Sequence, residues 1–147
     1  MKFGSSIEID LPREKVVALF IDPNNIKEYQ EGFVKKVLVS GPSGEAGAIS
    51  KLYFKNGKHE MELTETIVSN NLPDSLEAVY HHKHMDNTHV TSFVSLGENK
   101  TKYITEGEYT RINWIMPKLM AILFPSMYRK PAEKWMKNFK TFAENAG

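Results

Sequence analysis

The hydrophobic residues near the end of the chain return at the period of a helix. Between Met127 and Phe142 they are spaced three and four positions apart, and charged residues fill many of the positions between them. This spacing predicts an amphipathic helix with one wide apolar face. Residues 114–124 are nearly all apolar and predict a first helical piece, which Pro125 separates from the second. Such a helix needs another layer of structure to cover its apolar face.

Ahead of this helix, hydrophobic and polar positions alternate with the period of a strand. A first strand is expected over residues 7–11, and two short amphipathic helices are expected over residues 12–22 and 24–30. Asp22-Pro23 ends the first of these helices, because the residue before a proline disfavours helical geometry. Further strands are expected over residues 33–39, 48–55, 58–68, 75–84, 89–96 and 101–111.

Short polar stretches separate the last six predicted strands. Residues 41–47 and 70–74 predict loops, whereas Asn56-Gly57 and Asp86-Asn87 predict tight hairpin turns. Strands joined by short turns pair antiparallel. We therefore expect an α+β fold of order β-α-α-β6-α, in which a curved, seven-stranded antiparallel sheet wraps around the long C-terminal helix. A curved sheet of this kind leaves an apolar cavity between itself and the helix.

The composition narrows the classes of function. The chain has 147 residues, a formal net charge of +1 and no cysteine. This length predicts a single domain over residues 1–147. The lack of cysteine excludes disulfides and thiolate metal sites and fits the reducing cytoplasm, where we expect the protein. Acidic and basic residues are interspersed, which disfavours a nucleic-acid partner. Phosphate-binding and nucleotide-binding glycine motifs are lacking, so we expect no cofactor.

The apolar segments are too short to cross a membrane. Residues 114–124 are the most apolar run, and they contain Pro117 and Lys118. This run is compatible with transient contact with a membrane surface. Residues 1–6 hold no long apolar run, so we expect no signal peptide.

The order of these elements resembles the helix-grip superfamily, which includes START lipid-transfer domains, the birch-pollen-allergen group, polyketide cyclases and Hsp90-activator-like proteins. The resemblance covers nearly the whole chain. The strand, proline and helix between Ile7 and Pro23, and the Gly41–Gly47 loop, are similar to the bacterial branch of polyketide cyclase/dehydrase and lipid-transport-like proteins. The resemblance implies the helix-grip fold, but this fold serves carriers, cyclases, hydroxylase domains and chaperone regulators. We find no Rieske-type ligand set.

Histidines cluster around one predicted hairpin. If Asp86-Asn87 forms the turn, His84 lies opposite His89, and His82 lies on the same face. Three imidazoles on one face can hold zinc with an open fourth position. The alternative, which we favour, is an exposed polar hairpin tip without a metal.

Glu65 lies in a predicted strand on the same face as apolar residues. Met61, Leu63 and Ile67 alternate with polar positions there, which places Glu65 toward the helix. A carboxylate in that position can move a proton or bind a ligand hydroxyl. The alternative is a structural role, in which Glu65 pairs with a lysine such as Lys51, Lys58 or Lys102.

Aromatic residues and methionines supply the remaining cavity candidates. Aromatic rings combine apolar area with a polar group, and methionine adapts to varied apolar ligands. For any one of them, an ordinary place in the core is the alternative. The full set of candidate ligand-binding residues is Tyr53, Met61, Leu63, Glu65, Tyr80, His82, Phe93, Tyr103, Met120, Phe124, Met127 and Trp135.

Three functions remain open at this point. The first is binding or transport of an apolar small molecule, such as a lipid, polyketide, isoprenoid or quinone. The second is a cyclase/dehydrase-type enzyme, in which Glu65, Tyr80 and His82 move protons on a bound apolar substrate. The third is an Hsp90-activator-like interaction module that uses residues 114–124 as its surface. Binding ranks first, because only Glu65 is placed deep in the predicted cavity.

Overall fold

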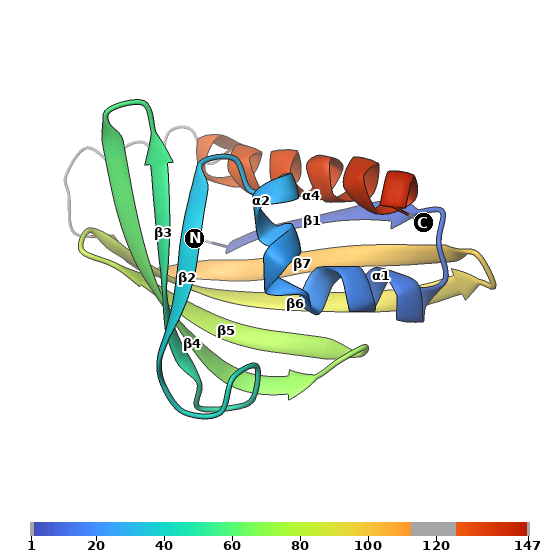
Figure 1. The fold of residues 1–147 in the computed structure, drawn as a ribbon, viewed down its shortest axis with the longest axis horizontal. Coiled ribbons are helices and arrows are strands. Elements are labelled where there is room, and N and C mark those ends of the chain that lie inside the picture. The colour runs from blue at the N-terminus through green and yellow to red at the C-terminus, as the bar shows by residue number, and fades with distance from the viewer. Residues whose placement is uncertain (1, 113–125, 147) are drawn as a thin grey trace.

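The predicted strands form one antiparallel sheet in the computed structural model, which describes residues 2–112 and 126–146 (Figure 1). These residues contain the strands β1 (Lys2–Ile9), β2 (Phe33–Ser40), β3 (Ile49–Asn56), β4 (His59–Asn71), β5 (Ser75–His82), β6 (Met85–Gly97) and β7 (Lys100–Ile112). The helices are α1 (Arg13–Ile21), the short 3-10 turn η1 (Pro23–Asn25), α2 (Ile26–Tyr29) and α4 (Ser126–Ala146). The predicted helical piece over residues 114–124 lies outside the described residues.

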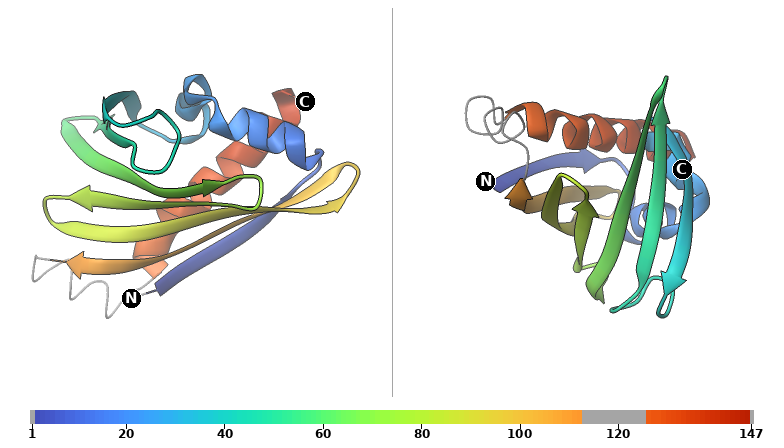
Figure 2. Two further views of the ribbon diagram at one scale, coloured as in Figure 1. Left: turned by 90° about the horizontal axis from the view of Figure 1, so that it is seen from below. Right: turned by 90° about the vertical axis from the view of Figure 1, so that its left-hand side faces the viewer.

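The strand order confirms the predicted architecture. The seven strands of the described residues follow one another in the order β1-β7-β6-β5-β4-β3-β2, and all neighbours are antiparallel. Strand β1 reaches its place beside β7 because α1, η1 and α2 carry the chain from one edge of the sheet to the other. Figure 2 shows that the sheet curves, so that β2, β3 and β4 turn away from the direction of β1, while α4 runs along one face.

One predicted turn is wrong. Asp86 and Asn87 lie inside β6, and the β5–β6 turn is formed by residues 83 and 84. The reason is a cross-strand partner: the Arg111 guanidinium donates to Asp86 Oδ2 at 2.7 Å and to Oδ1 at 3.1 Å. Asn87 pairs with Tyr80 on one side and Tyr109 on the other. These contacts outweigh the turn preference of the Asp-Asn pair.

Strands β1 and β4 extend beyond their predicted bounds, as β6 does at its start. Strand β1 begins at Lys2 rather than Ile7, because it pairs with β7 along its whole length. Strand β4 continues through Asn71, a residue predicted to lie in a loop, because its last residues pair with β5. Pairing with a neighbouring strand therefore decides both ends, rather than the local residue preference.

The first helix is bounded by the residues expected from the sequence. Pro12 immediately precedes α1, and its carbonyl accepts from the amides of Lys15 and Val16, both at 3.1 Å. Asp22 follows the helix, and its carboxylate accepts from the amide of Asn24 at 2.9 Å. This bond starts η1, with Pro23 at its first position.

The main core lies between β1, β6, β7 and helix α4. Phe93 of β6 and Phe139 of α4 are buried at its centre, with Ile9 and Val16 beside them. Helix α4 packs chiefly against β1 and α2, and Lys140 Nζ donates to the Glu8 carbonyl at 2.7 Å. The helix runs through Pro131 without interruption. The centre of the sheet, at β4 and β5, therefore lies away from the contact between helix and sheet.

Candidate functional site

Glu65 lies on the inner face of the sheet, as its alternation with apolar residues predicts. It is only 8% exposed, and Ile67, two positions further along β4, is buried as well. Leu63 on the same face is half-buried, and Met61 near the end of the strand is exposed. A carboxylate placed among apolar residues in this way costs free energy unless it is paired.

Two side chains from other strands satisfy this carboxylate. The Tyr80 hydroxyl, from β5, donates to Glu65 Oε2 at 2.7 Å. The Lys36 ammonium, from β2, lies 3.0 Å from Glu65 Oε1. Lys36 reaches Glu65 across β3, where the small Ser50 is the Cα partner of Glu65. Lys36, rather than the lysines considered from the sequence, is therefore the cationic partner of Glu65.

Two further phenols and an imidazole lie in the same electrostatic environment. Burial raises the pKa of Tyr29, and the negative charge of Glu65 raises it further. The pKa of Tyr80 lies well above its usual range for the same two reasons, in the same order. Burial also raises the pKa of Tyr103. Burial lowers the pKa of His89, while Glu65 acts in the opposite direction.

Burial affects the ionisation of these side chains more than any nearby charge does. Tyr80 and His89 are half-buried, so part of each residue's surface is still exposed to solvent. Burial is nevertheless the largest cause of the pKa shift of both side chains. Glu65, Tyr80, Lys36, His89, Tyr29 and Tyr103 are called the inner polar group below.

Aromatic rings cover one side of the inner polar group. Phe20 of α1 meets Phe93, Tyr103 and Phe139 edge to face, with centroid distances of 5.2, 5.9 and 6.0 Å. Tyr29 of α2 packs against Phe139 at 5.0 Å in the same manner. These edge-to-face contacts join the rings of Phe20, Phe93, Tyr103, Phe139 and Tyr29 into one aromatic wall.

The structure brings together some of the predicted residues and separates others. Leu63, Glu65, Tyr80, Phe93 and Tyr103 occupy the inner side of the sheet. Trp135 of α4 stacks on Phe54 of β3 with a centroid distance of 5.8 Å and an interplanar angle of 7°. Met120 and Phe124 lie outside the described residues, and the side chain of Met127 is not described.

Tyr53 points away from α4. It lies between the buried residues Leu52 and Phe54 on β3, so its side chain is on the opposite face, and the Lys35 ammonium lies 5.0 Å from the centre of its ring. Sequence alternation could have placed Tyr53 outside, because Leu52 and Phe54 occupy the positions on either side of it.

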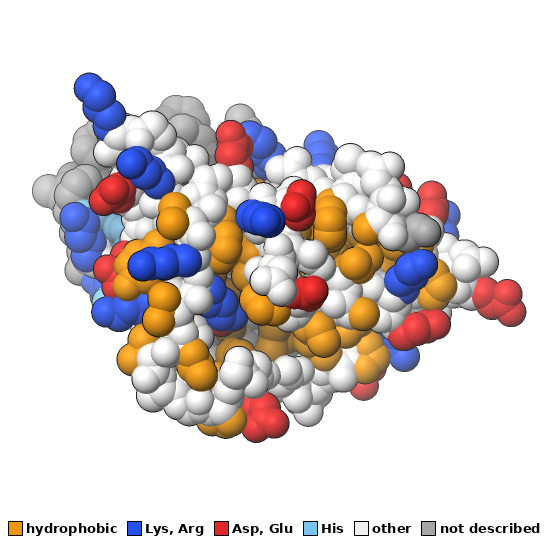
Figure 3. All heavy atoms as spheres, in the orientation of Figure 1, with side chains coloured by type: hydrophobic (Ala, Val, Ile, Leu, Met, Phe, Trp, Pro, Cys, Tyr) orange, Lys and Arg blue, Asp and Glu red, His pale blue; other side chains and the backbone are white. Residues whose placement is uncertain are grey.

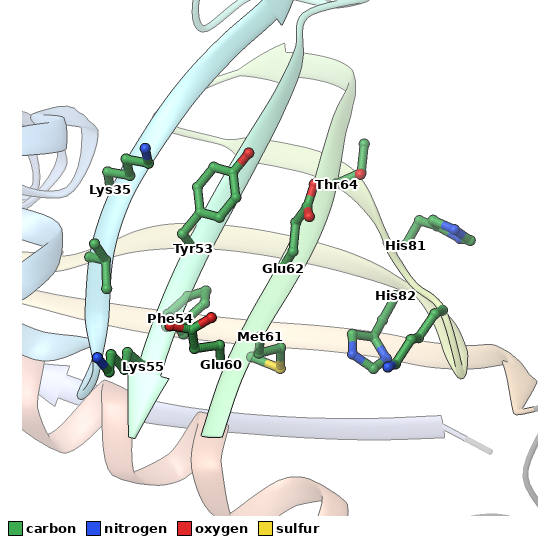
Figure 4. Close-up of a pocket in the computed structure, with 12 residues that line it drawn as sticks. Lys35, Tyr53, Phe54, Lys55, Glu60, Met61, Glu62, Thr64, His81 and His82 are labelled. Atoms are coloured by element: carbon green, nitrogen blue, oxygen red, sulfur yellow. The ribbon is translucent and has the colours of Figure 1, made fainter. Parts of the chain in front are cut away.

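A groove runs across the ends of β3, β4 and β5 near their hairpin turns. It has a volume of about 710 Å³. Figure 4 shows Lys35, Tyr53 and Glu62 side by side on its wall. Met61 and His82 also line it. Its wall carries five charged residues, Lys35, Lys55, Glu60, Glu62 and Lys83, and none of Glu65, Tyr80 or His89. The inner polar group and this groove are therefore separate places on the sheet.

The predicted grouping of three histidines on one face does not form. Because the turn lies at residues 83 and 84, His89 pairs with Ala78 and lies away from the hairpin tip. His82 and His84 remain neighbours, with ring centroids 5.4 Å apart. Among residues 2–112 and 126–146 no group of three or more His, Cys, Asp or Glu side chains could hold a metal ion.

Comparison with known proteins finds similarity of structure only. No protein-family model matches the sequence, and no curated protein matches it. A START superfamily protein from Mycobacterium smegmatis superposes with a TM-score of 0.81 at 10% identity over 99% of both chains. TTHA0849 from Thermus thermophilus has a TM-score of 0.79 at 16% identity and covers 100% of this chain and 99% of its own.

A third neighbour is an enzyme by its description. The Zhui aromatase/cyclase from Streptomyces sp. R1128 has a TM-score of 0.79 at 8% identity, over 98% of this chain and 93% of its own. No helix of the described residues is long and apolar enough to cross a membrane. The strand order, the long helix α4 and these neighbours together identify the fold of this chain as the helix-grip fold, which the START superfamily protein and the aromatase/cyclase share.

Proposed function

We propose that the protein binds an apolar small molecule of the lipid, polyketide, isoprenoid or quinone type between the sheet and α4. The observation that carries this proposal is the inner polar group: Glu65, Tyr80 and Lys36 meet on a sheet face that also carries buried apolar and aromatic side chains such as Ile67 and Phe93. Ligand sites combine apolar walls with a few convergent polar groups in this way. The apolar part of the ligand would pack on the aromatic wall, and its polar atoms would meet the inner polar group.

The surface beside β2 and α1 favours approach of an apolar ligand. Figure 3 shows hydrophobic side chains gathered on the face of the molecule that carries β2, α1 and α2. Ile21, Val34 and Val39 are more than half exposed, and Val37 and Leu38 are 43% and 46% exposed. An exposed apolar patch of this kind is a usual feature of a site that admits apolar molecules.

A cyclase/dehydrase-type enzyme is the second candidate. The bond between Glu65 and Tyr80 favours it, because a paired carboxylate and phenol can shuttle a proton. The raised pKa of Tyr80 counts against it, because a phenol that holds its proton well above neutral pH is a poor acid. Lys36 and Tyr80 also occupy one carboxylate oxygen each. Binding therefore ranks above catalysis. The interaction-module alternative depends on residues 114–124, which lie outside the described residues.

Native mass spectrometry of freshly purified protein, with extraction and identification of any released molecule, tests the binding proposal. We expect a reproducible apolar adduct, or saturable binding of the fluorescent probe N-phenyl-1-naphthylamine. The variant Ala78→Trp fills space on the inner face beside Ile67 and His89. It should weaken probe binding at least tenfold, whereas Val94→Trp, at a residue that is 44% exposed, should leave it unchanged. Equal binding by both variants contradicts the proposed site.

A further inference from the structure

The two edges of the sheet differ in what lies beside them. At one edge, α4 runs beside β1, and its Lys140 ammonium donates to the Glu8 carbonyl at 2.7 Å. The Glu144 carboxylate of the same helix accepts from the Asp10 amide at 2.8 Å. At the other edge, β2 has β3 as its one strand neighbour among the described residues (Figure 2). The backbone of β2 therefore has no strand partner there on the side away from β3, and such an edge can pair with a further strand.

The side chains of β2 make this edge apolar. Its exposed apolar residues are Val34, Val37, Leu38 and Val39. Lysines commonly guard an exposed edge against pairing. Here the Lys36 ammonium lies 3.0 Å from Glu65 Oε1, and the Lys35 ammonium lies 5.0 Å from the ring centre of Tyr53. Both charges are thus held over the neighbouring strands β3 and β4 and do not project beyond the edge.

We propose that β2 pairs antiparallel with β2 of a second copy of this chain, so that two sheets join edge to edge in a weak, closed dimer. A two-fold axis at Val37 places this valine opposite its own copy and Lys36 opposite Leu38 of the second copy. Lys36 and Leu38 share the inner face, because their partners on β3, Leu52 and Ser50, are both buried. The alkyl stem of the lysine can therefore pack on the leucine.

Charge fits a second copy and selects this register. Strand β2 holds two lysines and no acidic residue. An axis at Lys36 would set the two Lys36 side chains opposite each other, and like charges in that position are unfavourable. An axis at Leu38 would fall at a register shift of β2, where the strand is irregular. The whole chain carries a net charge of only +1, so two copies do not repel each other strongly.

The arrangement ends at two copies. After pairing, the remaining edges of the joined sheet are the two β1 strands, and α4 lies beside each of them. One strand from each copy makes a small interface, at the low end of specific interfaces below about 1,200 Å². We therefore expect a dissociation constant of roughly 10 µM to 1 mM. Ile21, which belongs to the exposed apolar patch, lies on α1 and takes no part in this pairing.

A charge swap at the axis tests the inference. Sedimentation equilibrium between about 10 µM and about 1 mM should show a monomer–dimer equilibrium of the wild type. Val37→Lys and Val37→Glu each place two like charges at the axis, so each should weaken the dimer by about tenfold. An equimolar mixture of these two variants should dimerise again, because opposite charges then face each other. Val94→Lys, at an exposed valine of β6, should leave the dimer unchanged.

Hydrogen exchange on the same samples locates the contact, and circular dichroism shows whether each variant is folded. Amides of residues 34–40 should exchange more slowly at the high concentration, whereas those of β1 should not change. A wild type that stays monomeric at about 1 mM overturns the inference and leaves the edge to an extended segment of another protein. A dimer that both Val37 variants leave intact, or whose protected amides lie outside β2, overturns the β2 interface. Failure of the mixture to dimerise overturns the axis at Val37.

Discussion

At the scale of single residues, Glu65 shows that the alternation of a strand predicts which face a side chain occupies, whereas the register between strands decides its partners. Alternation along β4 was sufficient to place Glu65 on the inner face. Its partners could not be predicted, because they depend on which residues of β2 and β5 come level with it. Strand β2 also has a register shift between Phe33 and Lys35. This shift decides that Lys36, and not Lys35, lies on the inner face.

The two adjacent lysines of β2 offer a matched test of this ion pair. Lys36 faces Glu65, whereas Lys35 lies over the outer-face ring of Tyr53. Lys36→Met should lower the free energy of unfolding by about 1–3 kcal/mol, because it leaves a largely buried carboxylate without its cation. Lys35→Met should cost about 0.5 kcal/mol or less. Urea unfolding measures both.

The same measurement in the Glu65→Gln background shows whether the loss comes from the pair. With a neutral side chain at position 65, Lys36→Met should cost less than half of its value in the wild type, because no unpaired charge remains. Equal losses for Lys35→Met and Lys36→Met in the wild-type background contradict an energetic role of this contact.

At the scale of elements, the sequence pattern predicted every strand and the described helices, and it failed at one turn. The Asp86-Asn87 pair has the local preference of a turn, yet Arg111, 25 positions away, holds Asp86 inside a strand. No local pattern reports a partner that far along the chain. The same error misplaces His89, which pairs with Ala78 inside β6 and does not lie beside the hairpin tip.

The contact between α4 and β3 depends on one aromatic stack. Trp135 lies parallel to Phe54, which is 3% exposed. Because Trp135 itself is half-buried, Trp135→Ala should lower the free energy of unfolding by about 3 kcal/mol, at the lower end of the range for large core aromatics. Trp135→Phe should retain much of the stability. Urea unfolding followed by circular dichroism measures these effects.

The matched control for this helix is Lys137→Ala, at an exposed position two residues further along α4. It should change the free energy of unfolding by about 0.5 kcal/mol or less. A loss near zero for Trp135→Ala would show that the stack does not hold α4 on the sheet, and it would remove Trp135 from the candidate site as well.

At the scale of the whole molecule, the anchoring of α4 and the Glu65–Tyr80 pair involve different strands. Helix α4 is fixed on β1 and α2 by buried residues and by polar contacts such as Asp10 amide to Glu144 Oε2 at 2.8 Å. Glu65 and Tyr80 lie on β4 and β5, whereas His89 lies on β6, the strand that carries Phe93 of the core. The Glu65 carboxylate and the Tyr80 phenol can therefore occupy the inner face of β4 and β5 while the core beneath α4 maintains stability.

This arrangement predicts that stability falls in alkali. Burial raises the pKa of Tyr29, Tyr80 and Tyr103 in the folded protein, whereas in the unfolded chain each takes its ordinary value of about 10. Below that value the buried phenols are protonated in both states and their contribution is complete. As the pH rises above it, the unfolded chain loses the protons first, so the stability is progressively lost toward the folded pKa.

The expected size of the loss is roughly 1 kcal/mol for each buried phenol between about pH 9 and pH 11. Urea unfolding at a series of pH values measures it. Tyr103→Phe removes one of the three phenols and should reduce the loss by about a third. Tyr53→Phe, on the outer face of β3, should leave it unchanged. A loss in Tyr103→Phe as large as in the wild type would mean that the unfolded chain and the folded protein hold this proton equally. The phenol would then be hydrated in the native state, and the inner face of the sheet would be open to bulk water rather than a sheltered site for an apolar ligand.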